Sequence, residues 1–356
     1  MKFSVDKSVF LSSLASIVGI TKGKVAFPIL GMVRIEAADG VLNSRTTNTE
    51  IDMVAKCAAD VLEPGVVCVS AVQLHDIVSA APKGLVDFSI DGSWLIVRAG
   101  RAMFRLVTSP SAEFPVQAEA DVPSAKMPAK DAKWMLAGVA KSVSTDDVRY
   151  NLCGVYVESN GERLRFVASD GHRLSLREMK WIGPVASAIV PAEAIRAAGE
   201  MEDLSFGLNA QRVVFSGTHI ALTARCIEGK FPDYELVIPT QHKGTVMVNR
   251  LELVEAVKRV LIMAVDRART IRLRHDDNAW CIEAVTPQLG EARERVDVQS
   301  DGTIVEIGVN GSYLLDALNA IDTDQALFSM GDNQSPIVVT PNDVANTKHV
   351  IMPIKI

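Results

Sequence analysis

A threefold internal repeat with a period of about 120 residues limits what this 356-residue chain can fold into. Three short strands end in Val5, Met127 and Val248, which lie 122 and 121 positions apart. Each strand leads into a segment whose apolar residues recur at helical spacing. This spacing predicts helices over Val5–Val18, Ala129–Val143 and Asn249–Met263.

The same period appears again in the middle of each repeat. Segments beginning at Val69, Val190 and Val309 each join a strand to a helix, and they lie 121 and 119 positions apart. Phe-Pro pairs at positions 114–115 and 231–232 give a third echo, 117 positions apart. Three landmarks that share one period indicate three copies of one structural unit.

The rest of each repeat is typical of short strands, because apolar and polar residues alternate and Gly-containing turns separate the segments. Each repeat therefore contains two helices and about eight strands, which predicts an α+β fold rather than a doubly wound parallel sheet. We place the domain boundaries so that the domains cover residues 1–122, 123–244 and 245–356. The predicted strands include Leu95–Arg98, Met103–Val107, Val155–Glu158, Leu164–Ala168, Arg212–Ser216, Ala221–Arg225, Thr270–Arg274 and Trp280–Ala284.

Composition excludes several classes of protein. Hydrophobic residues make up 48% and charged residues 22%, as in folded soluble proteins, and no apolar run approaches the ~20 residues that cross a bilayer. The five cysteines are scattered without C-x-x-C spacing, which favours a reducing compartment, and we expect a cytoplasmic protein. Nucleotide-binding, zinc-protease and hydrolase motifs are missing, so we expect no cofactor and no metal.

Charge is unevenly distributed along the chain, although the net charge is only −6. Between Arg250 and Arg274 there are seven basic residues and three acidic ones, whereas Asp297 to Asp343 holds eight acidic residues and no basic one. An uneven solvated surface explains this pattern. The negative total taken alone argues mildly against nucleic acid as a partner, but the locally cationic segment does not.

The stretch from Ser169 to Leu174, S-D-G-H-R-L, is the richest in reactive side chains. An enzyme using Asp170 and His172 is one interpretation, but catalytic triads are normally assembled from separate segments. A hydrogen-bonded turn with Asp170 capping amides and Gly171 at positive φ is the structural alternative. A third interpretation is a rigid turn that serves as a recognition surface.

Several motifs together resemble the bacterial DNA polymerase III sliding clamp, the beta subunit. The runs R-Y-N-L-C-G-V-Y-V-E (149–158) and V-A-S-D-G-H-R-L (167–174) carry most of the resemblance. P-I-L-G (28–31), G-K-F-P-D-Y (229–234), the terminal V-I-M-P-I-K-I and the opening M-K-F-S-V agree, so the resemblance covers the whole chain. The family usually has Asn in place of Cys153, Thr in place of Ser169 and Met-Arg-Leu in place of Ile354-Lys355-Ile356.

The resemblance implies three repeated clamp domains and a non-catalytic replication processivity factor. Such a ring holds duplex DNA by encircling it, so it needs weak phosphate contacts and no base readout. Helices packed roughly 8–10 Å apart give a twelve-helix ring about 31–38 Å across, whereas six helices give about half of that. Two chains therefore fit around DNA and one does not, which predicts a head-to-tail homodimer.

The resemblance also implies a pocket for short linear peptides. Met and aliphatic side chains suit such a slot, and His172 and Arg173 are expected to hold the peptide backbone. The positions that match the family's pocket are Leu152, Ser169, Gly171, His172, Arg173, Leu174, Pro232, Val237, Pro336, Val350, Met352 and Ile354.

Two further surfaces follow from the matched motifs and the predicted helices. The candidate DNA-facing residues are Lys24, Lys133, Lys141, Arg149, Tyr150, Arg196, Lys258 and Arg259. The candidate dimer interface joins Phe104, Leu106, Arg98 and Arg101 of one subunit to Ile262, Met263, Glu291 and Glu294 of the other.

The partners expected from the resemblance are double-stranded DNA without sequence specificity, a second copy of the chain and the replicative DNA polymerase alpha subunit. A clamp-loader complex and other proteins with clamp-binding motifs are also expected as partners. No interaction with a membrane is expected. Because the chain lacks a Walker A motif, another protein's ATP hydrolysis must open the ring. A secondary clamp used in repair or inhibitor resistance is the alternative.

Overall fold

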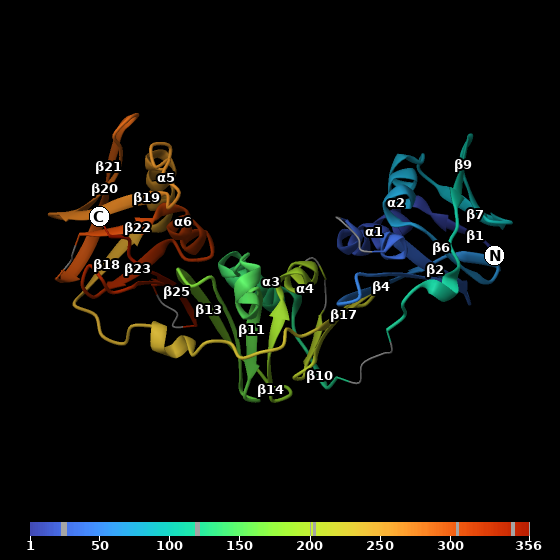
Figure 1. Cartoon of the computed structure of the whole chain (residues 1–356), viewed down its shortest axis with the longest axis horizontal. Coiled ribbons are helices and arrows are strands. Elements are labelled where there is room, and N and C mark those ends of the chain that lie inside the picture. Colours follow the sequence, from blue (N-terminus) through green and yellow to red (C-terminus); the bar gives the residue numbers. More distant parts are fainter. Residues whose placement is uncertain are drawn as a thin grey trace. The chain divides into compact units, whose positions relative to one another are not determined.

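The computed structural model describes residues 1–22, 27–117, 122–199, 201, 204–303, 306–342 and 346–355. These residues form two compact units (Figure 1). The first unit comprises Met1–Lys133 and Glu193–Cys226, and the second comprises Trp134–Ala192 and Ile227–Ile356. The second repeat therefore contributes strands to both units.

Among its described residues, the first repeat forms two α-helices and nine strands. Helix α1 follows β1 directly because the Asp6 carboxylate accepts a hydrogen bond from the Ser8 amide at 2.8 Å and so caps the helix. The elements are β1 (Lys2–Asp6), α1 (Lys7–Ile17), β2 (Met32–Ala38), β3 (Val41–Thr47), β4 (Ile51–Ala58), β5 (Asp60–Glu63), β6 (Gly65–Ser70), α2 (Ala71–Ala80), β7 (Leu85–Asp91), β8 (Trp94–Ala99) and β9 (Ala102–Val107).

The second repeat forms two helices and eight strands. They are β10 (Ser124–Lys126), α3 (Ala129–Val139), β11 (Gly154–Ser159), β12 (Arg163–Ser169), β13 (Arg173–Lys180), β14 (Ala186–Pro191), α4 (Ala192–Gly199), β15 (Ser205–Leu208), β16 (Arg212–Ser216) and β17 (Ile220–Arg225).

The third repeat has the same composition of elements. They are β18 (Gly244–Asn249), α5 (Arg250–Val260), β19 (Thr270–Asp276), β20 (Ala279–Thr286), β21 (Gly290–Gly302), β22 (Ile307–Asn310), α6 (Gly311–Asn319), β23 (Gln325–Met330), β24 (Ile337–Pro341) and β25 (Thr347–Ile351). Short 3-10 turns also occur; η4 (Ala140–Ser142), η5 (Asp147–Leu152) and η6 (Tyr234–Val237) matter for the site.

All strand pairs within the sheets are antiparallel, which confirms the predicted α+β class. The first unit holds a sheet in the order β5-β1-β7-β8-β9 and another in the order β10-β15-β16-β17-β4-β3-β2-β6. The second unit holds one sheet in the order β14-β11-β12-β13-β25-β24-β23-β18-β21-β20-β19-β22. In both units, sheets run continuously from one sequence repeat into the next.

The six helices confirm the predicted repeat. The first helices of the three repeats begin at Lys7, Ala129 and Arg250, and the second helices begin at Ala71, Ala192 and Gly311, so both sets keep the period seen in the sequence. The helices are shorter than predicted chiefly because they end earlier: α1 and α3 pass into 3-10 turns at Val18 and Ala140, and α5 ends at Val260. In Figure 1, α1 packs beside α2 in the first unit and α5 beside α6 in the second.

Apolar side chains between helices and sheets hold each unit together. In the first unit, Phe88 stacks on Phe3 with ring centroids 4.7 Å apart. In the second unit, Trp280 and Phe328 meet edge to face at the same centroid distance of 4.7 Å. Among the described residues, no helix combines the length and the apolar character that crossing a bilayer requires.

Candidate functional site: a turn and an apolar pocket

The turn between β12 and β13 is held by its own side chains. The Ser169 hydroxyl donates to the Arg173 carbonyl at 2.8 Å and accepts from the Gly171 amide at 3.1 Å. The Asp170 carboxylate accepts from the amides of His172 and Arg173 at 2.9 and 3.0 Å. Gly171 has a φ of +85°, which disfavours any side chain. The enzyme interpretation of this stretch is therefore wrong, since Ser169 and Asp170 are engaged with the main chain and build a turn.

A cavity of about 200 Å³ lies beside this turn within the second unit. Its walls come from η5, the β12–β13 turn, the segment leading into η6, and the end of β25. The cavity is lined by Leu152, Ser169, Gly171, Arg173, Leu174, Phe231, Pro232, Tyr234, Val237, Val350 and Met352.

Nine of the twelve predicted pocket residues line this cavity. Pro336 and Ile354 are half-buried elsewhere, and the amide of Ile354 donates to the Gly308 carbonyl. His172 is exposed and does not line the cavity, but its carbonyl accepts a hydrogen bond from the Met352 amide at 3.0 Å. His172 thus ties the C-terminal segment to the turn through its main chain.

Phe231 and Tyr234 also line the cavity, although they were not among the residues predicted for it; both belong to the G-K-F-P-D-Y run. Phe231 stacks on Tyr156 with centroids 5.2 Å apart. The Tyr234 hydroxyl donates to Glu158 at 2.6 Å, so its ring is fixed while its edge lines the cavity. Their place in the sequence could have predicted this, because a Phe and a Tyr on either side of Pro232 are expected to pack beside the residues that Pro232 contacts.

Two flexible or branched side chains remain accessible at the cavity. Met352 is 38% exposed and Val237 is 40% exposed, whereas Leu174 and Val350 are buried. Unbranched Met352 can adapt to ligand side chains of different shape. The arrangement therefore offers an apolar slot with an adaptable rim, suited to binding aliphatic or aromatic side chains.

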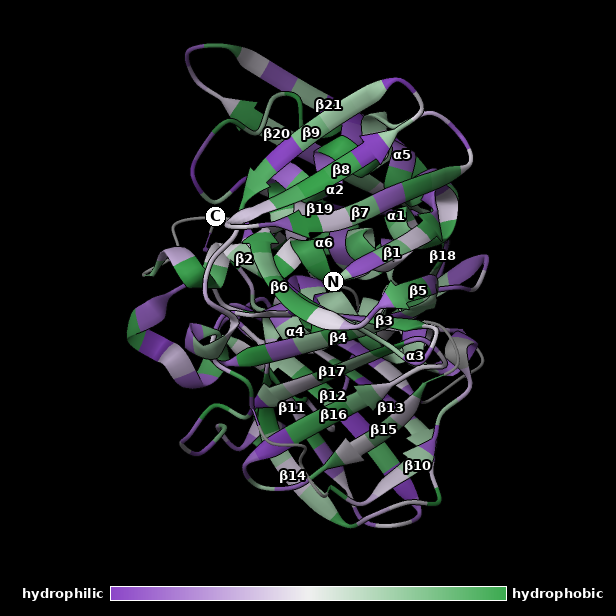
Figure 2. Cartoon of the chain, turned by 90° about the vertical axis from the view of Figure 1, so that its right-hand side faces the viewer, coloured by the Kyte–Doolittle hydropathy of each residue, from purple (hydrophilic) through white to green (hydrophobic). Residues whose placement is uncertain are grey.

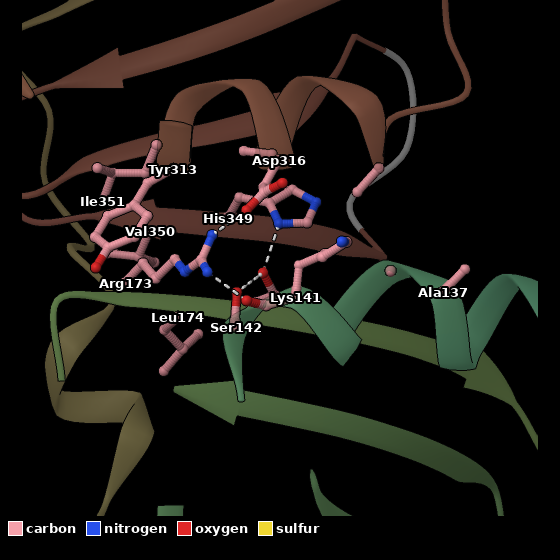
Figure 3. A pocket seen from close by; sticks show the side chains of 14 residues that line it. Ala137, Lys141, Ser142, Arg173, Leu174, Tyr313, Asp316, His349, Val350 and Ile351 are labelled. Carbon is pink, nitrogen blue, oxygen red and sulfur yellow. Dashed lines mark hydrogen bonds and ion pairs between the residues drawn. The ribbon is translucent and has the colours of Figure 1, made fainter. Parts of the chain in front are cut away.

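Of the described residues that line the cavity, Arg173 is the one cation. Its Nε donates to Asp170 at 3.0 Å and its Nη1 donates to Asp316 of α6 at 2.6 Å. Its Nη2 donates to the Lys141 carbonyl, and its guanidinium lies 4.2 Å from the ring centre of Tyr313 (Figure 3). The charge is therefore fully compensated and the side chain is 13% exposed.

Behind Arg173 lies a buried polar chain. The Ser142 and Ser175 hydroxyls are 2.7 Å apart, and the Ser175 hydroxyl lies 2.8 Å from Nδ1 of His349 (Figure 3). Burial first, and then the nearby charges of Arg177 and Arg173, lower the pKa of His349 to about 3. His349 is therefore neutral throughout the physiological range.

The candidate DNA-facing residues occupy different environments. Lys133, Lys141 and Arg196 are exposed on or next to α3 and α4, and Tyr150 is 58% exposed. The other cations are engaged: Arg149 with Asp146 at 3.0 Å, Lys258 with Glu255 at 2.8 Å, and Arg259 with Glu294 at 2.9 Å. Lys24 lies outside the described residues.

The candidate interface residues fall at the edge strand β9 and in the third repeat. Figure 2 shows β7, β8 and β9 side by side, with β9 last in its sheet. Phe104 is half-buried and Leu106 is buried, while Arg98 and Arg101 are exposed. In the third repeat, Ile262 is 73% exposed, Met263 is half-buried, Glu291 is exposed, and Glu294 is engaged by Arg259.

No group of three or more His, Cys, Asp or Glu residues that could hold a metal ion occurs within the described ranges.

Family models, curated relatives and solved structures all match this chain to the same family. Family models for the DNA polymerase III beta subunit match the chain in sequence: the N-terminal domain over residues 1–118, the central domain over 126–233 and the C-terminal domain over 235–355. A relative from Escherichia coli strain K12, named "Beta sliding clamp", is 33% identical over 374 residues and covers 100% of both chains.

Solved structures agree. The sliding clamp (DNA polymerase III subunit beta) of Pseudomonas aeruginosa bound to griselimycin has a TM-score of 0.93 and 30% identity, with 100% of both chains covered. The corresponding protein of Bartonella birtlesii, also bound to griselimycin, has a TM-score of 0.94 and 28% identity, again over 100% of both chains.

Proposed function

This chain belongs to the DNA polymerase III beta subunit family, the bacterial sliding clamps, and we propose that two copies of it close head to tail around duplex DNA. The protein is a non-catalytic processivity factor of DNA replication. We assign the three clamp domains to residues 1–122, 123–244 and 245–356. A closed ring stays on DNA because the duplex is threaded through it, so its phosphate contacts can be weak and interchangeable.

Edge strand β9 supports the proposed closure. An unpaired edge invites aggregation unless another strand or a subunit covers it. Leu106 and Phe104 give this strand an apolar face, and Ile262 and Met263 are the proposed apolar partners in the second copy. Arg98 and Arg101 remain exposed for ion pairs with acidic residues of that copy, of which Glu291 is exposed and Glu294 is engaged by Arg259.

Exposed cations on or next to the helices support the proposed DNA contacts. Lys133, Lys141 and Arg196 have no competing acidic partner among the residues that the structure describes, so they are free to follow phosphates. Arg149, Lys258 and Arg259 must exchange an ion pair for each phosphate contact. Such exchange keeps the contacts weak, as sliding requires.

The apolar cavity beside the β12–β13 turn carries the proposed docking function. Its walls include buried Leu and Val side chains, its rim includes Met352, and the charge of Arg173 in its wall is compensated by Asp170 and Asp316. We propose that the replicative polymerase alpha subunit, the clamp loader and other clamp-binding proteins each insert a short peptide there, within the cytoplasm. Because the site is a slot for side chains, the same pocket serves many partners in turn.

Peptide binding tests this assignment. Fluorescein-labelled peptides that tile the cognate polymerase alpha subunit are titrated with the full-length chain, and fluorescence anisotropy identifies the binding segment. Met352→Ala and Leu152→Ala should each weaken that segment's binding by about tenfold or more, because both truncate the apolar wall. Ile182→Ala, at a position 93% exposed and away from the cavity, is the matched control and should bind normally. Full affinity in both pocket variants would remove the assignment.

Griselimycin offers a second ligand. Two of the related clamps, from Pseudomonas aeruginosa and Bartonella birtlesii, are bound to griselimycin, and we propose that this chain binds it too, in the same pocket. Griselimycin should displace the labelled peptide from the wild-type chain. Simultaneous binding of both ligands would place griselimycin elsewhere.

Encirclement is tested separately with DNA. The chain, loaded by its clamp loader onto nicked circular DNA, should stay bound during gel filtration and leave after the circle is linearised. Retention that is unchanged by cutting would show that affinity rather than threading holds the protein.

A further inference from the structure

We propose that the first unit carries a second docking groove, which binds carboxylate side chains of an acidic segment in a partner protein. The groove has a volume of about 370 Å³ and shares no described lining residue with the apolar cavity. It lies on one face of β2, β3, β4 and β17, which are neighbours in one sheet (Figure 2). Its charged lining residues are Arg34, Glu36, Arg45, Asp52 and Lys56.

The strands of this groove repeat the framework of the apolar pocket. Asp52 on β4 and Leu174 on β13 lie 122 positions apart, at corresponding places in the first two repeats. Asp52 faces Thr223 of the neighbouring strand β17, just as Leu174 faces Val350 of β25. Asp52 and Thr223 line the groove, whereas Leu174 and Val350 line the cavity. The same framework therefore presents polar side chains in the first unit where the second unit presents apolar ones.

Two arginines of the groove lie directly opposite each other. Arg34 on β2 and Arg45 on β3 are paired across the sheet, an arrangement of like charges that destabilises neighbouring strands. Nη1 of Arg34 donates to Glu36 at 2.8 Å, whereas Nε of Arg45 lies 3.6 Å from Asp52, too far for a hydrogen bond. Such a local charge conflict is expected at a binding site, where a negatively charged ligand offsets it.

Arg45 and Lys56 supply the donors for the ligand. Among the described residues, Arg45 makes one hydrogen bond, from Nη1 to the Gln117 carbonyl at 3.4 Å, so most of its N–H groups stay available. Lys56 is exposed and pairs with no acidic side chain in the described part of the chain. Burial raises the pKa of Asp52 to about 6, so this carboxyl group can take up a proton as another anion approaches. The groove therefore offers a planar guanidinium and an ammonium to one incoming carboxylate.

The side chains of the groove favour a peptide over a nucleic acid. The carboxylates of Glu36 and Asp52 repel a continuous run of phosphates, whereas an isolated carboxylate can approach Arg45 and Lys56. The described lining residues include no aromatic ring on which the bases of a single strand could stack. The occupant that fits is an acidic peptide segment.

A rhodamine-labelled peptide of Glu-Gly repeats is the probe, titrated with the full-length chain at low salt and followed by fluorescence anisotropy. Lys56→Gln should weaken binding about 3- to 5-fold, and Arg45→Gln about tenfold. Lys56→Arg keeps the charge and should stay within about twofold of the wild type. Lys243→Gln is the matched control, because Lys243 is 63% exposed, lies outside the groove and carries the same charge.

Three results of this titration would overturn the proposal. They are a wild-type chain that does not bind the probe, equal affinity in Lys56→Gln and wild type, and an equal loss in Lys243→Gln. The folding of Lys56→Gln is not in question, because the side chain is exposed. Since the groove and the apolar cavity share no described lining residue, none of these results bears on the proposed peptide docking in the second unit.

Cross-linking locates the bound probe on the wild-type chain. A carbodiimide joins a carboxylate to a neighbouring lysine amine with loss of water, and mass spectrometry should identify Lys56 as the main site. Cross-links to other lysines alone would place the peptide elsewhere and overturn the proposal. A single-stranded oligothymidylate that displaces the probe, and that itself binds more weakly to Lys56→Gln, would assign the groove to nucleic acid instead.

Discussion

The buried imidazole of His349 makes the stability of the second unit depend on pH. His349 is 2% exposed, and its Nδ1 meets only the Ser175 hydroxyl, while Nε2 has no hydrogen-bond partner among the described residues. Burial and the charges of Arg177 and Arg173 lower its pKa to about 3, whereas an unfolded chain has a histidine pKa of about 6.5. Between these two pH values, His349 is protonated in the unfolded state and neutral in the folded state.

The folded state therefore loses stability as the pH falls below about 6.5, and the loss continues toward pH 3. About pH 5 lies roughly 1.5 units below the pKa of histidine in the unfolded chain, and each unit corresponds to about 1.4 kcal/mol. Protonation of His349 in the unfolded state should therefore lower the free energy of unfolding by about 2 kcal/mol relative to pH 7.5. We predict that His349→Asn removes this dependence, because Asn does not titrate and can still hydrogen-bond to Ser175.

Urea unfolding at fixed chain concentration, followed by circular dichroism at about pH 7.5 and pH 5, measures the effect. The free energy of unfolding of the wild type, minus that of His349→Asn, should fall by about 2 kcal/mol between the two pH values. Any constant cost of the substitution cancels in this comparison. A difference that stays constant to within about 0.5 kcal/mol would show that His349 is protonated in the folded chain, and would refute the reasoning.

Two further substitutions test local strain and charge burial. Gly171→Ala should lower the free energy of unfolding by about 1–2 kcal/mol, because φ is +85° there, and should also weaken peptide binding, because the new Cβ would lie 2.5 Å from Nη1 of Arg149. Gly161→Ala has a similar φ of +91° away from the pocket, so equal peptide binding in both variants would contradict this. Burial, only partly offset by Arg45 at 3.6 Å, raises the pKa of Asp52 to about 6, so the wild type should lose on the order of 1–3 kcal/mol as the pH rises from about 4 to 7. Asp52→Asn should lack that loss in urea titrations, and an identical pH profile would contradict the assigned burial.

The repeat in the sequence was enough to predict the class of fold and the position of every helix. This succeeded because each of these helices follows a strand, and α1, α2, α5 and α6 start at a local side-chain cap, as at Asn249 and Asn310. The pairing across repeats was not predictable in the same way. That β4 pairs with β17, and β13 with β25, depends on contacts between distant segments that no periodicity reports.

In the pocket too, residues that act through their local sequence could be predicted, and residues that depend on contacts between distant segments could not. Turn residues such as Gly171 were recognisable because their chemistry is local. Phe231 and Tyr234 were missed because their membership depends on where the segment after β17 crosses the sheet. The partners of Arg173 on α6 were equally invisible, since Asp316 lies 143 positions away in sequence.

The close fit of Gly138 against Arg177 has a consequence for protein engineering. A Cβ at position 138 would overlap the Arg177 side chain, so a methyl group there would force that buried side chain to move. The two positions are therefore coupled, although they lie 39 positions apart in the sequence. A chimaera that combines α3 of one clamp with β13 of another therefore needs compatible residues at positions 138 and 177. Otherwise the two side chains will clash in the core.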